Sequence, residues 1–393
     1  MGKKIIKNDI KLKATKIFTD RQEPRDAFWN KYNFISEHMG DDEASVLSYY
    51  GIGGIGKTSL CKKIIEEIKE RKPKTKYVYV DFNDRQDAKN VLANIKNDLT
   101  KRYNFSFFLF DYALYSHEIK CGKNIEKPEI QTIISSSKSL SLIFDVADSI
   151  PLISTFSGIM KSTDAAFALV RNLKNKYKKE ISEIEAADIL ELKKKLPIYF
   201  AEDMVNNIKN EKEPFVVIMD TYEQLVNEMS SIGEPLMNDL WIRSDENGIV
   251  TRIPNTLWVI AGRESLKWKR FDASWDEDCL EQHIMGDLSE ADSVSFLELA
   301  GIAEPELRLA IYELTKGVPF HLDMCVDTYQ AINNKGESPS IDAFEGNIDV
   351  LAERFIRYMD HYEQDIIYTL VCMEQWSDDD FYTACEHMKL PFG

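Results

Sequence analysis

A glycine-rich loop followed by a lysine and a threonine is the part of this sequence best suited to chemistry. The run GIGGIGKT matches the pattern GxxxxGK[ST]. Its glycines allow main-chain N–H groups to turn inward and approach a phosphate chain closely. Lys57 would place a positive charge between the outer phosphates, and the Thr58 hydroxyl would bind Mg²⁺. The pattern predicts a nucleotide site made by Gly51, Gly53, Gly54, Ile55, Gly56, Lys57, Thr58 and Ser59.

The segments on either side of this loop have the context that the pattern requires. Residues 45–50, SVLSYY, have the composition of a buried strand. After the loop, TSLCKKIIEEIKE places its apolar residues on one face of a helix, whose N-terminus would add its dipole to an anion site. A strand in KYVYVDFND and a helix in DAKNVLANIKNDL follow.

A later apolar strand introduces two acidic residues. The run from Phe215 to Met219 is continuously apolar and ends in Asp220. A carboxylate at the carboxyl end of a parallel strand beside the loop can hold the magnesium shell. Glu223 is placed to polarise a water for attack on the terminal phosphate. The alternatives are that Asp220 is an ordinary strand-end residue and that Glu223 lies on a surface helix.

A third apolar strand, in NTLWVIAGRESLKW, ends at Arg263. At that position a guanidinium could reach the terminal phosphate and sense its presence. The alternative is a surface arginine that pairs with Glu264. Its place at the strand end favours the sensing role.

Composition limits the function classes. The chain has 393 residues, a length that suggests two or three domains, and 44% of them are hydrophobic. Its formal net charge of -17 disfavours a general nucleic-acid binder, although a local basic patch could exist. The basic run RNLKNKYKKE is followed by acidic residues, which favours a solvated helix face.

The cysteines, histidines and amino-terminal segment bear on location and metals. The six cysteines form no CxxC pair and the six histidines no HExxH motif, so we expect no disulfide framework and no structural metal. The basic start lacks the apolar core of a signal peptide, and no apolar run approaches a membrane span. We expect a cytoplasmic protein, and these features disfavour a membrane partner.

With these residues in view, the chain resembles the STAND class of signalling P-loop ATPases, relatives of the AAA+ proteins that include NB-ARC and NOD-like receptors. The glycine loop, the strand ending in Asp220 and the strand ending in Arg263 carry the likeness, together with ELTKGVPFHLDMCVD, which is similar to the family's GxP element. The likeness covers residues 15–100 and 210–375. It implies an α/β P-loop NTPase fold of AAA+/STAND type, with a parallel sheet flanked by helices.

The resemblance also implies roles outside the loop. Pro319 of the GxP element would touch adenine, and Gly317 would permit the preceding turn. Arg21 lies in a segment similar to the one that leads these ATPases into their first strand, close to the nucleotide base. Before the GxP element, Ser289 and Asp292 suit a helix N-cap and its third position.

Two departures from the family pattern affect the expected activity. Many relatives have a second acidic residue where this chain has Gln224, so Glu223 is the one nearby candidate base and hydrolysis is expected to be slow. The GVP element has no arginine-bearing sensor, which argues against a processive AAA+ motor.

The resemblance divides the chain into expected domains. These are an extension (1–17), a nucleotide-binding domain (18–285) with a helical insertion at about 101–210, a helical lid (286–358) and the beginning of a winged-helix domain (359–393). The insertion would either pack on the core or offer a surface to a partner or membrane, and packing is favoured. The segment 359–393 stops before a winged-helix domain could be complete, and no repeat of 20 to 50 residues appears, so we expect an amino-terminal fragment of a longer switch protein, with a natural short form as the alternative.

The implied function is a regulatory ATPase switch that binds ATP or ADP with Mg²⁺. ADP would hold the resting state, and ATP would expose a surface for self-oligomerisation in response to an unknown protein trigger or effector. Signal perception, stress response and bacterial immunity such as phage defence are the implied roles, with no specific nucleic-acid partner. The alternatives are a AAA+-type remodelling or nucleic-acid-loading ATPase acting by continuous hydrolysis, and a P-loop kinase, which the long lid fits poorly.

Overall fold

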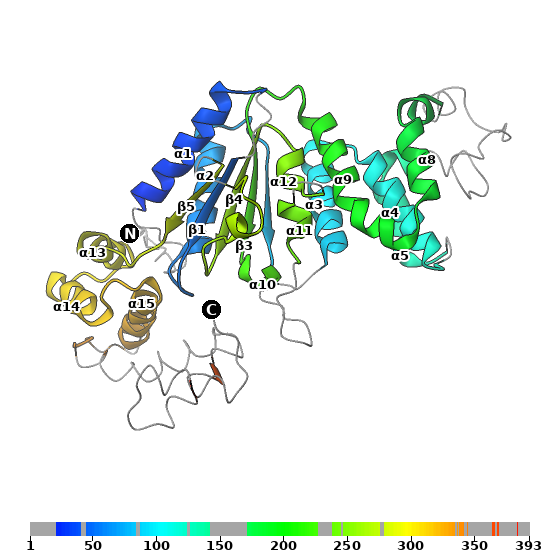
Figure 1. The fold of residues 1–393 in the computed structure, drawn as a ribbon. Helices are drawn as coiled ribbons and strands as arrows, with labels where there is room; N and C mark the ends of the chain where they lie inside the picture. Colours follow the sequence, from blue (N-terminus) through cyan, green and yellow to red (C-terminus); the bar gives the residue numbers. More distant parts are fainter. Residues whose placement is uncertain are drawn as a thin grey trace, which may run out of the picture.

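A five-stranded parallel sheet forms the centre of the computed structural model (Figure 1). Its strands are β1 (Ser45–Tyr50), β2 (Tyr77–Asp81), β3 (Phe215–Asp220), β4 (Thr256–Gly262) and β5 (Leu280–Ile284), in the order β2-β3-β4-β1-β5. The bounds of β1 and β3 confirm the strands predicted there, whereas β5 was not predicted. The structure describes residues 21–40, 45–83, 87–123, 126–141, 171–226, 238–244, 247–275 and 279–334, and 336, 338–341, 344, 364–365, 368 and 383.

Helices cover both faces of the sheet, so its central strands are apolar on both sides. Helices α1 (Gln22–Glu37) and α2 (Lys57–Arg71) cover one face, and α3 (Ala88–Tyr103) and α9 (Ile189–Ile208) lie on the other side (Figure 1). A hydrophobic core lies on each face of the sheet, and alternate residues of β3 belong to one or the other. Val216 and Ile218 pack with α1 and α2, whereas Val217 and Met219 face the opposite core. This two-sided burial explains why β3 and β4 are continuous apolar runs.

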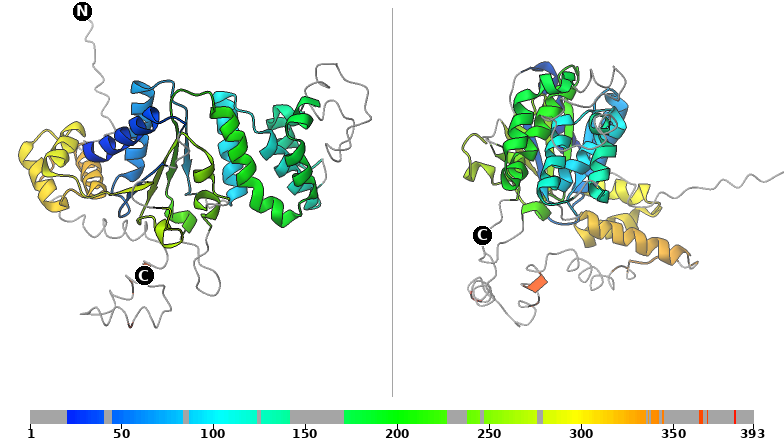
Figure 2. Two further views of the ribbon diagram at one scale, coloured as in Figure 1. Left: turned by 45° about the horizontal axis from the view of Figure 1, so that its top comes forward. Right: turned by 90° about the vertical axis from the view of Figure 1, so that its right-hand side faces the viewer.

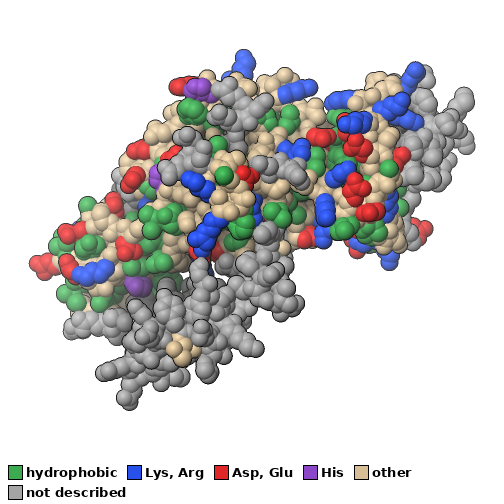
Figure 3. All heavy atoms as spheres, viewed as in Figure 1, with side chains coloured by type: hydrophobic (Ala, Val, Ile, Leu, Met, Phe, Trp, Pro, Cys, Tyr) green, Lys and Arg blue, Asp and Glu red, His purple; other side chains and the backbone are tan. Residues whose placement is uncertain are grey.

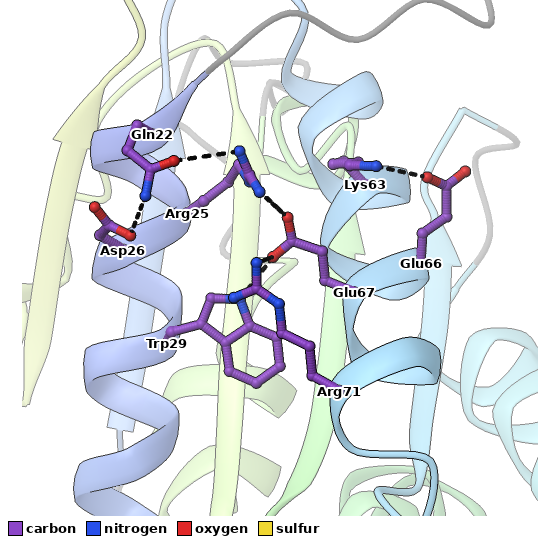
Figure 4. A network of polar contacts seen from close by, with 8 residues as sticks. All are labelled: Gln22, Arg25, Asp26, Trp29, Lys63, Glu66, Glu67 and Arg71. Atoms are coloured by element: carbon purple, nitrogen blue, oxygen red, sulfur yellow. Dashed lines mark hydrogen bonds and ion pairs between the residues drawn. The ribbon is translucent and has the colours of Figure 1, made fainter.

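Helix α1 is fixed to α2 by one buried carboxylate (Figure 4). Glu67 of α2 is 2% exposed, and it accepts hydrogen bonds from Arg25 Nε and Trp29 Nε1, each at 2.6 Å. The guanidinium of Arg71 lies over the Trp29 ring. A buried carboxylate needs such partners, and these contacts hold α1 against α2. Arg21, the residue before α1, reaches the glycine loop.

Further helices extend away from the sheet beside α9 (Figure 2). They are α4 (Phe108–Lys120), α5 (Pro128–Ser136) and α8 (Lys178–Ala186). Helix α4 is buried over most of its length. The Phe110 N–H in the first turn of α4 donates to Asp203 of α9 at 2.9 Å. In the described part of 101–210, the apolar helices therefore pack on their own chain; the assignment of this range as an insertion stays a prediction.

In the described residues up to Asn334, three helices follow β5 and have a core of their own. They are α13 (Glu290–Leu299), α14 (Pro305–Thr315) and α15 (Pro319–Asn334). The Ser289 hydroxyl accepts the Asp292 N–H at 3.1 Å, which confirms the predicted N-cap. The winged-helix expectation for 359–393 lies outside the described residues, apart from a few single positions. The remaining short elements are α10 (Glu223–Val226), α11 (Leu240–Arg243), α12 (Ile249–Arg252) and η3 (Trp268–Arg270).

The surface of the described residues mixes charges of both signs. On the face drawn in Figure 3, basic and acidic side chains are interspersed over the helices beside α9. The run from Arg171 to Lys179 has exposed basic residues, as expected for a solvated helix face. In the part of the chain that the structure describes, no helix is long and apolar enough to span a membrane.

Candidate nucleotide-binding site

The glycine loop joins β1 to α2, and its glycines are needed where other groups approach. Gly54 and Gly56 have φ values of 78° and 94°, in the region that favours glycine. A Cβ atom on Gly54 would lie 2.9 Å from the Phe320 Cβ of helix α15, and one on Gly51 would lie 2.8 Å from the Met285 carbonyl oxygen. Residues from beyond β5 therefore approach the loop closely at Gly51 and Gly54, whereas Ile52 and Gly54 remain exposed.

Lys57 is a buried cation whose hydrogen bonds go to neutral groups. Its Nζ donates to the carbonyl oxygens of Gly51 and Ile52, at 2.5 and 2.9 Å, and the residue is 9% exposed. Burial lowers the pKa of Lys57, while the nearby charges of Glu223 and Asp220 raise it. A buried ammonium bound to carbonyls fits a site that receives an anion.

The first turn of α2 directs its N–H groups toward the loop. The first hydrogen bond of this helix runs from the Leu60 N–H to the Gly56 carbonyl, at 3.0 Å. The N–H groups of Lys57, Thr58 and Ser59 precede it, as at any helix start, and are available to phosphate oxygens. Ile55 is buried beneath the loop, Thr58 is half-buried and Ser59 is exposed.

Asp220 ends β3 with both carboxylate oxygens hydrogen-bonded. Oδ1 accepts the Thr221 N–H at 2.9 Å, and Oδ2 accepts the Tyr79 hydroxyl at 2.8 Å. Asp81 lies opposite Asp220 in the parallel register and accepts the Thr221 hydroxyl at 2.9 Å. These contacts hold Thr221 at a φ of 58°, a rare conformation for a β-branched residue. Burial and Asp220 raise the pKa of Tyr79 above its usual value.

Glu223 and Arg263 lie together where β3 and β4 end. Glu223 is 8% exposed; its Oε1 lies 3.3 Å from Arg263 Nε, and its Oε2 accepts the Arg263 N–H at 3.2 Å. Burial raises the pKa of Glu223, against the effects of Lys57 and Arg263. Glu264, the alternative partner considered for Arg263, forms an ion pair with Lys267 at 3.2 Å. Both predicted residues are thus brought beside the loop.

Arg21 connects the loop to the segment after β5. Its two terminal nitrogens donate to the carbonyl oxygens of Ile55 and Gly286, each at 2.6 Å. The first carbonyl belongs to the glycine loop, and the second begins the path to α13. Arg21 therefore lies at the predicted site, bound to the loop backbone; its predicted contact with a base stays a prediction.

The turn before α15 requires its glycine. Gly317 has a φ of 81°, and a Cβ there would lie 2.0 Å from the Leu288 carbonyl oxygen. The Leu288 N–H donates to the Gly317 carbonyl at 2.8 Å, so this turn is fixed to the segment after β5. Pro319 begins α15 and is half-buried. The next residue, Phe320, packs against Gly54.

Several residues of this site were not predicted. Tyr79 and Asp81 lie on β2, which is beside β3 in the sheet, and Phe320 follows Pro319. An acidic residue at the end of a second parallel strand was a usable signal for Asp81, because such strand ends meet at one edge of the sheet. Tyr79 and Phe320 had no such signal, since their contacts depend on tertiary packing.

The donor atoms fit magnesium bound together with a phosphate group. Mg²⁺ prefers oxygen ligands and usually takes only one or two from the protein, the others coming from phosphate and water. The Thr58 hydroxyl and the Asp220 carboxylate supply oxygens of this kind. Among the described residues, no group of three or more His, Cys, Asp or Glu side chains could hold a metal without such help.

Comparison with known proteins gives one family match and several similar structures. The family described as Nephrocystin 3, N-terminal matches residues 25–150, which include the glycine loop. No curated protein sequence matches the chain. Similar structures include the ORC2 protein of Aeropyrum pernix in ADPNP–ADP complexes, with 14% identity and a TM-score of 0.46 over 96% of this chain and 83% of that one.

Two further structures have similar scores. The ORC1 protein of Aeropyrum pernix in complex with DNA has 10% identity and a TM-score of 0.45, over 95% of this chain and 78% of that one. Cdc6p of Pyrobaculum aerophilum has 10% identity and a TM-score of 0.42, over 96% of this chain and 84% of that one. The expectation that this protein has no specific nucleic-acid partner stays a prediction.

The chain's own topology defines its class. The sheet is parallel in the order β2-β3-β4-β1-β5, the glycine loop joins β1 to α2, and β3 ends in an acidic residue beside that loop. These features define an α/β P-loop NTPase fold, as the sequence predicted.

Proposed function

We propose that this protein is a regulatory ATPase of STAND type, in which the bound nucleotide controls the position of helices α13 to α15, the proposed lid. The observation that carries this proposal is the contact of Phe320 with Gly54. A loop that must shape itself around phosphates is in contact with the proposed lid at Gly54, so the loop's conformation and the position of the lid would depend on each other. Arg21 adds a second connection between the loop and the segment leading to the lid.

In this proposal the loop amides and the start of α2 bind the phosphate chain, and Lys57 adds a charge between the outer phosphates. Thr58 and Asp220 would hold Mg²⁺, which when bound neutralises phosphate charge. Pro319 and Arg21 would lie toward the base, which the resemblance implies is adenine.

Glu223 would accept a proton from the attacking water. The water oxygen bonds to the terminal phosphorus, the bond from that phosphorus to the bridging oxygen breaks, and ADP and phosphate leave. Arg263 would contact the terminal phosphate. In the structure Arg263 binds Glu223, so the proposed base and the proposed phosphate sensor are in contact. A base held in this way is consistent with slow hydrolysis.

A switch requires that ADP and ATP bind the two lid positions with different affinity, because equal affinity shifts nothing. We propose that ADP favours the lid position seen here, with Phe320 against Gly54. ATP would favour release of the lid, followed by self-oligomerisation in response to a protein trigger. A role in signalling, including bacterial immunity, rests on the resemblance.

The experiment is a pre-steady-state measurement of ATP hydrolysis, with the nucleotide of the purified protein identified first. A switch should copurify with ADP and, once emptied, release about one phosphate per chain in a burst, followed by slow turnover limited by ADP release. Continuous linear turnover from a nucleotide-free protein would reject the switch in favour of a remodelling ATPase.

A further inference from the structure

The carboxylate of Asp220 is held by a tyrosine from the neighbouring strand. The Tyr79 hydroxyl donates to Oδ2 at 2.8 Å, while the Thr221 N–H binds Oδ1 at 2.9 Å. Each oxygen thus has a hydrogen-bond donor, one from the neighbouring strand and one from the next residue of the chain. Because Asp220 is 1% exposed, solvent contributes little to orienting it.

The register of β2 and β3 makes this contact possible. Tyr79 lies opposite Ile218, two residues before the pair formed by Asp81 and Asp220. Its side chain packs against the core between the sheet and helices α1 and α2, and the hydroxyl reaches forward to the strand end. The ring is therefore fixed by packing, and its hydroxyl has a defined target.

We propose that Tyr79 is a positioning residue for the magnesium carboxylate. This rests on the proposed nucleotide function, because it assigns Asp220 to the magnesium shell. A carboxylate that is already oriented loses little rotational freedom when it binds hydrated Mg²⁺, whereas a freely rotating one must be ordered at that moment. Tyr79 would then strengthen binding of the magnesium–nucleotide complex without touching nucleotide or metal.

A purely structural role for Tyr79 predicts something different. If only the ring mattered, for packing, then removing the hydroxyl would change neither nucleotide nor magnesium binding. If the hydroxyl supported the loop in general, nucleotide affinity would fall with and without magnesium. A positioning role predicts a loss that appears only when magnesium is present.

The test is calorimetric titration of the whole chain with ADP, once in MgCl₂ and once in EDTA. Tyr79→Phe keeps the ring and removes the hydroxyl. Tyr77→Phe is the matched control, because Tyr77 lies two residues earlier on the same face of β2, opposite Val216. Thermal unfolding without ligand shows whether each variant is folded.

We expect Tyr79→Phe to weaken ADP binding in MgCl₂ by about threefold to tenfold, the worth of one hydrogen bond, and to leave binding in EDTA unchanged. The control should match wild type in both. Equal affinities of Tyr79→Phe and wild type in MgCl₂, or equal losses in both buffers, would overturn the positioning role. If wild type binds ADP in neither buffer, the proposed function itself fails.

Discussion

The carboxylate of Glu223 binds Arg263 twice, through the guanidinium Nε at 3.3 Å and through the main-chain N–H at 3.2 Å. One residue follows β3 and the other follows β4, so the ends of two neighbouring strands are linked at the candidate site. A phosphate that attracted the guanidinium would break the first contact and leave the second. Glu223 would then keep its position through the main-chain N–H and lose the guanidinium that neutralises its charge.

Replacing Glu223 by glutamine tests its assignment as the base. We expect Glu223→Gln to retain ADP affinity and to slow single-turnover ATP hydrolysis about a hundredfold or more, the usual contribution of a general base. Glu264→Gln, at an exposed neighbouring carboxylate, is the control and should hydrolyse at the wild-type rate. Unchanged hydrolysis in Glu223→Gln would place the base elsewhere.

Replacing Arg263 tests phosphate sensing. Arg263→Ala should weaken ATP binding more than ADP binding, because the contact proposed for Arg263 is with the phosphate that ADP lacks. Titrations with ADP and a non-hydrolysable ATP analogue give the affinity ratio. Arg270→Ala removes an exposed arginine from the same segment between β4 and β5 and should keep the wild-type affinity ratio. An identical ratio in Arg263→Ala and wild type would exclude the sensing role.

Gly54 tests the contact between loop and lid. Gly54→Ala adds a Cβ both at a φ of 78° and 2.9 Å from Phe320 Cβ, whereas Gly122→Ala adds one at a φ of 84° with nothing within 4 Å. Both variants carry backbone strain of about 1–2 kcal/mol, but only the first also forces the lid away. In urea unfolding, we expect a clearly larger decrease in the free energy of unfolding for Gly54→Ala than for Gly122→Ala. Equal decreases would mean that the contact between Phe320 and Gly54 does not stabilise the folded protein.

Glu118 gives a prediction about pH. It is buried and binds Lys123 at 2.6 Å and Lys89 at 2.9 Å. Burial alone would raise its pKa, but these hydrogen bonds lower the pKa to about 2, from an ordinary 4.5. Because the folded pKa is the lower one, the stabilisation is complete above pH 4.5 and disappears as the pH falls toward 2.

Glu118→Gln should therefore be less stable than wild type near neutral pH. The difference in the free energy of unfolding should shrink as the pH falls from 4.5 toward 2. Urea unfolding at several pH values measures it, with Glu70→Gln, an exposed carboxylate, as the control. A difference that stays constant across this range would contradict the assigned pKa.

Much of the fold follows from local patterns in the sequence. The strand from Phe215 is a continuous apolar run, the strand from Ser45 has the composition of a buried strand, and the Ser289 N-cap and the Gly317 turn depend on a few neighbouring residues. Such features are readable because their physical causes are local. Strand β5 was missed because it lies at the sheet edge, where four of its five residues are at least partly exposed and the pattern is weak.

The contacts within the site could not be read in the same way. The sequence predicted Glu223 and Arg263 separately, but their pairing depends on β3 lying beside β4. Phe320 meets Gly54 across 266 positions of the sequence, and only the arrangement of lid and sheet brings them together. Residue types and spacing indicate chemistry, whereas contacts between distant elements need the fold.

The most direct measurement is calorimetric titration of the purified, nucleotide-free chain and its Lys57→Ala variant with ADP and ATP in MgCl₂. Lys57 is the buried cation of the loop, so its loss should lower affinity at least about a hundredfold, while Lys62→Ala, at an exposed position of the same helix, should bind like wild type. Tight binding by wild type with this loss in Lys57→Ala is the predicted result. Equal affinities of wild type and Lys57→Ala for both nucleotides would contradict the account.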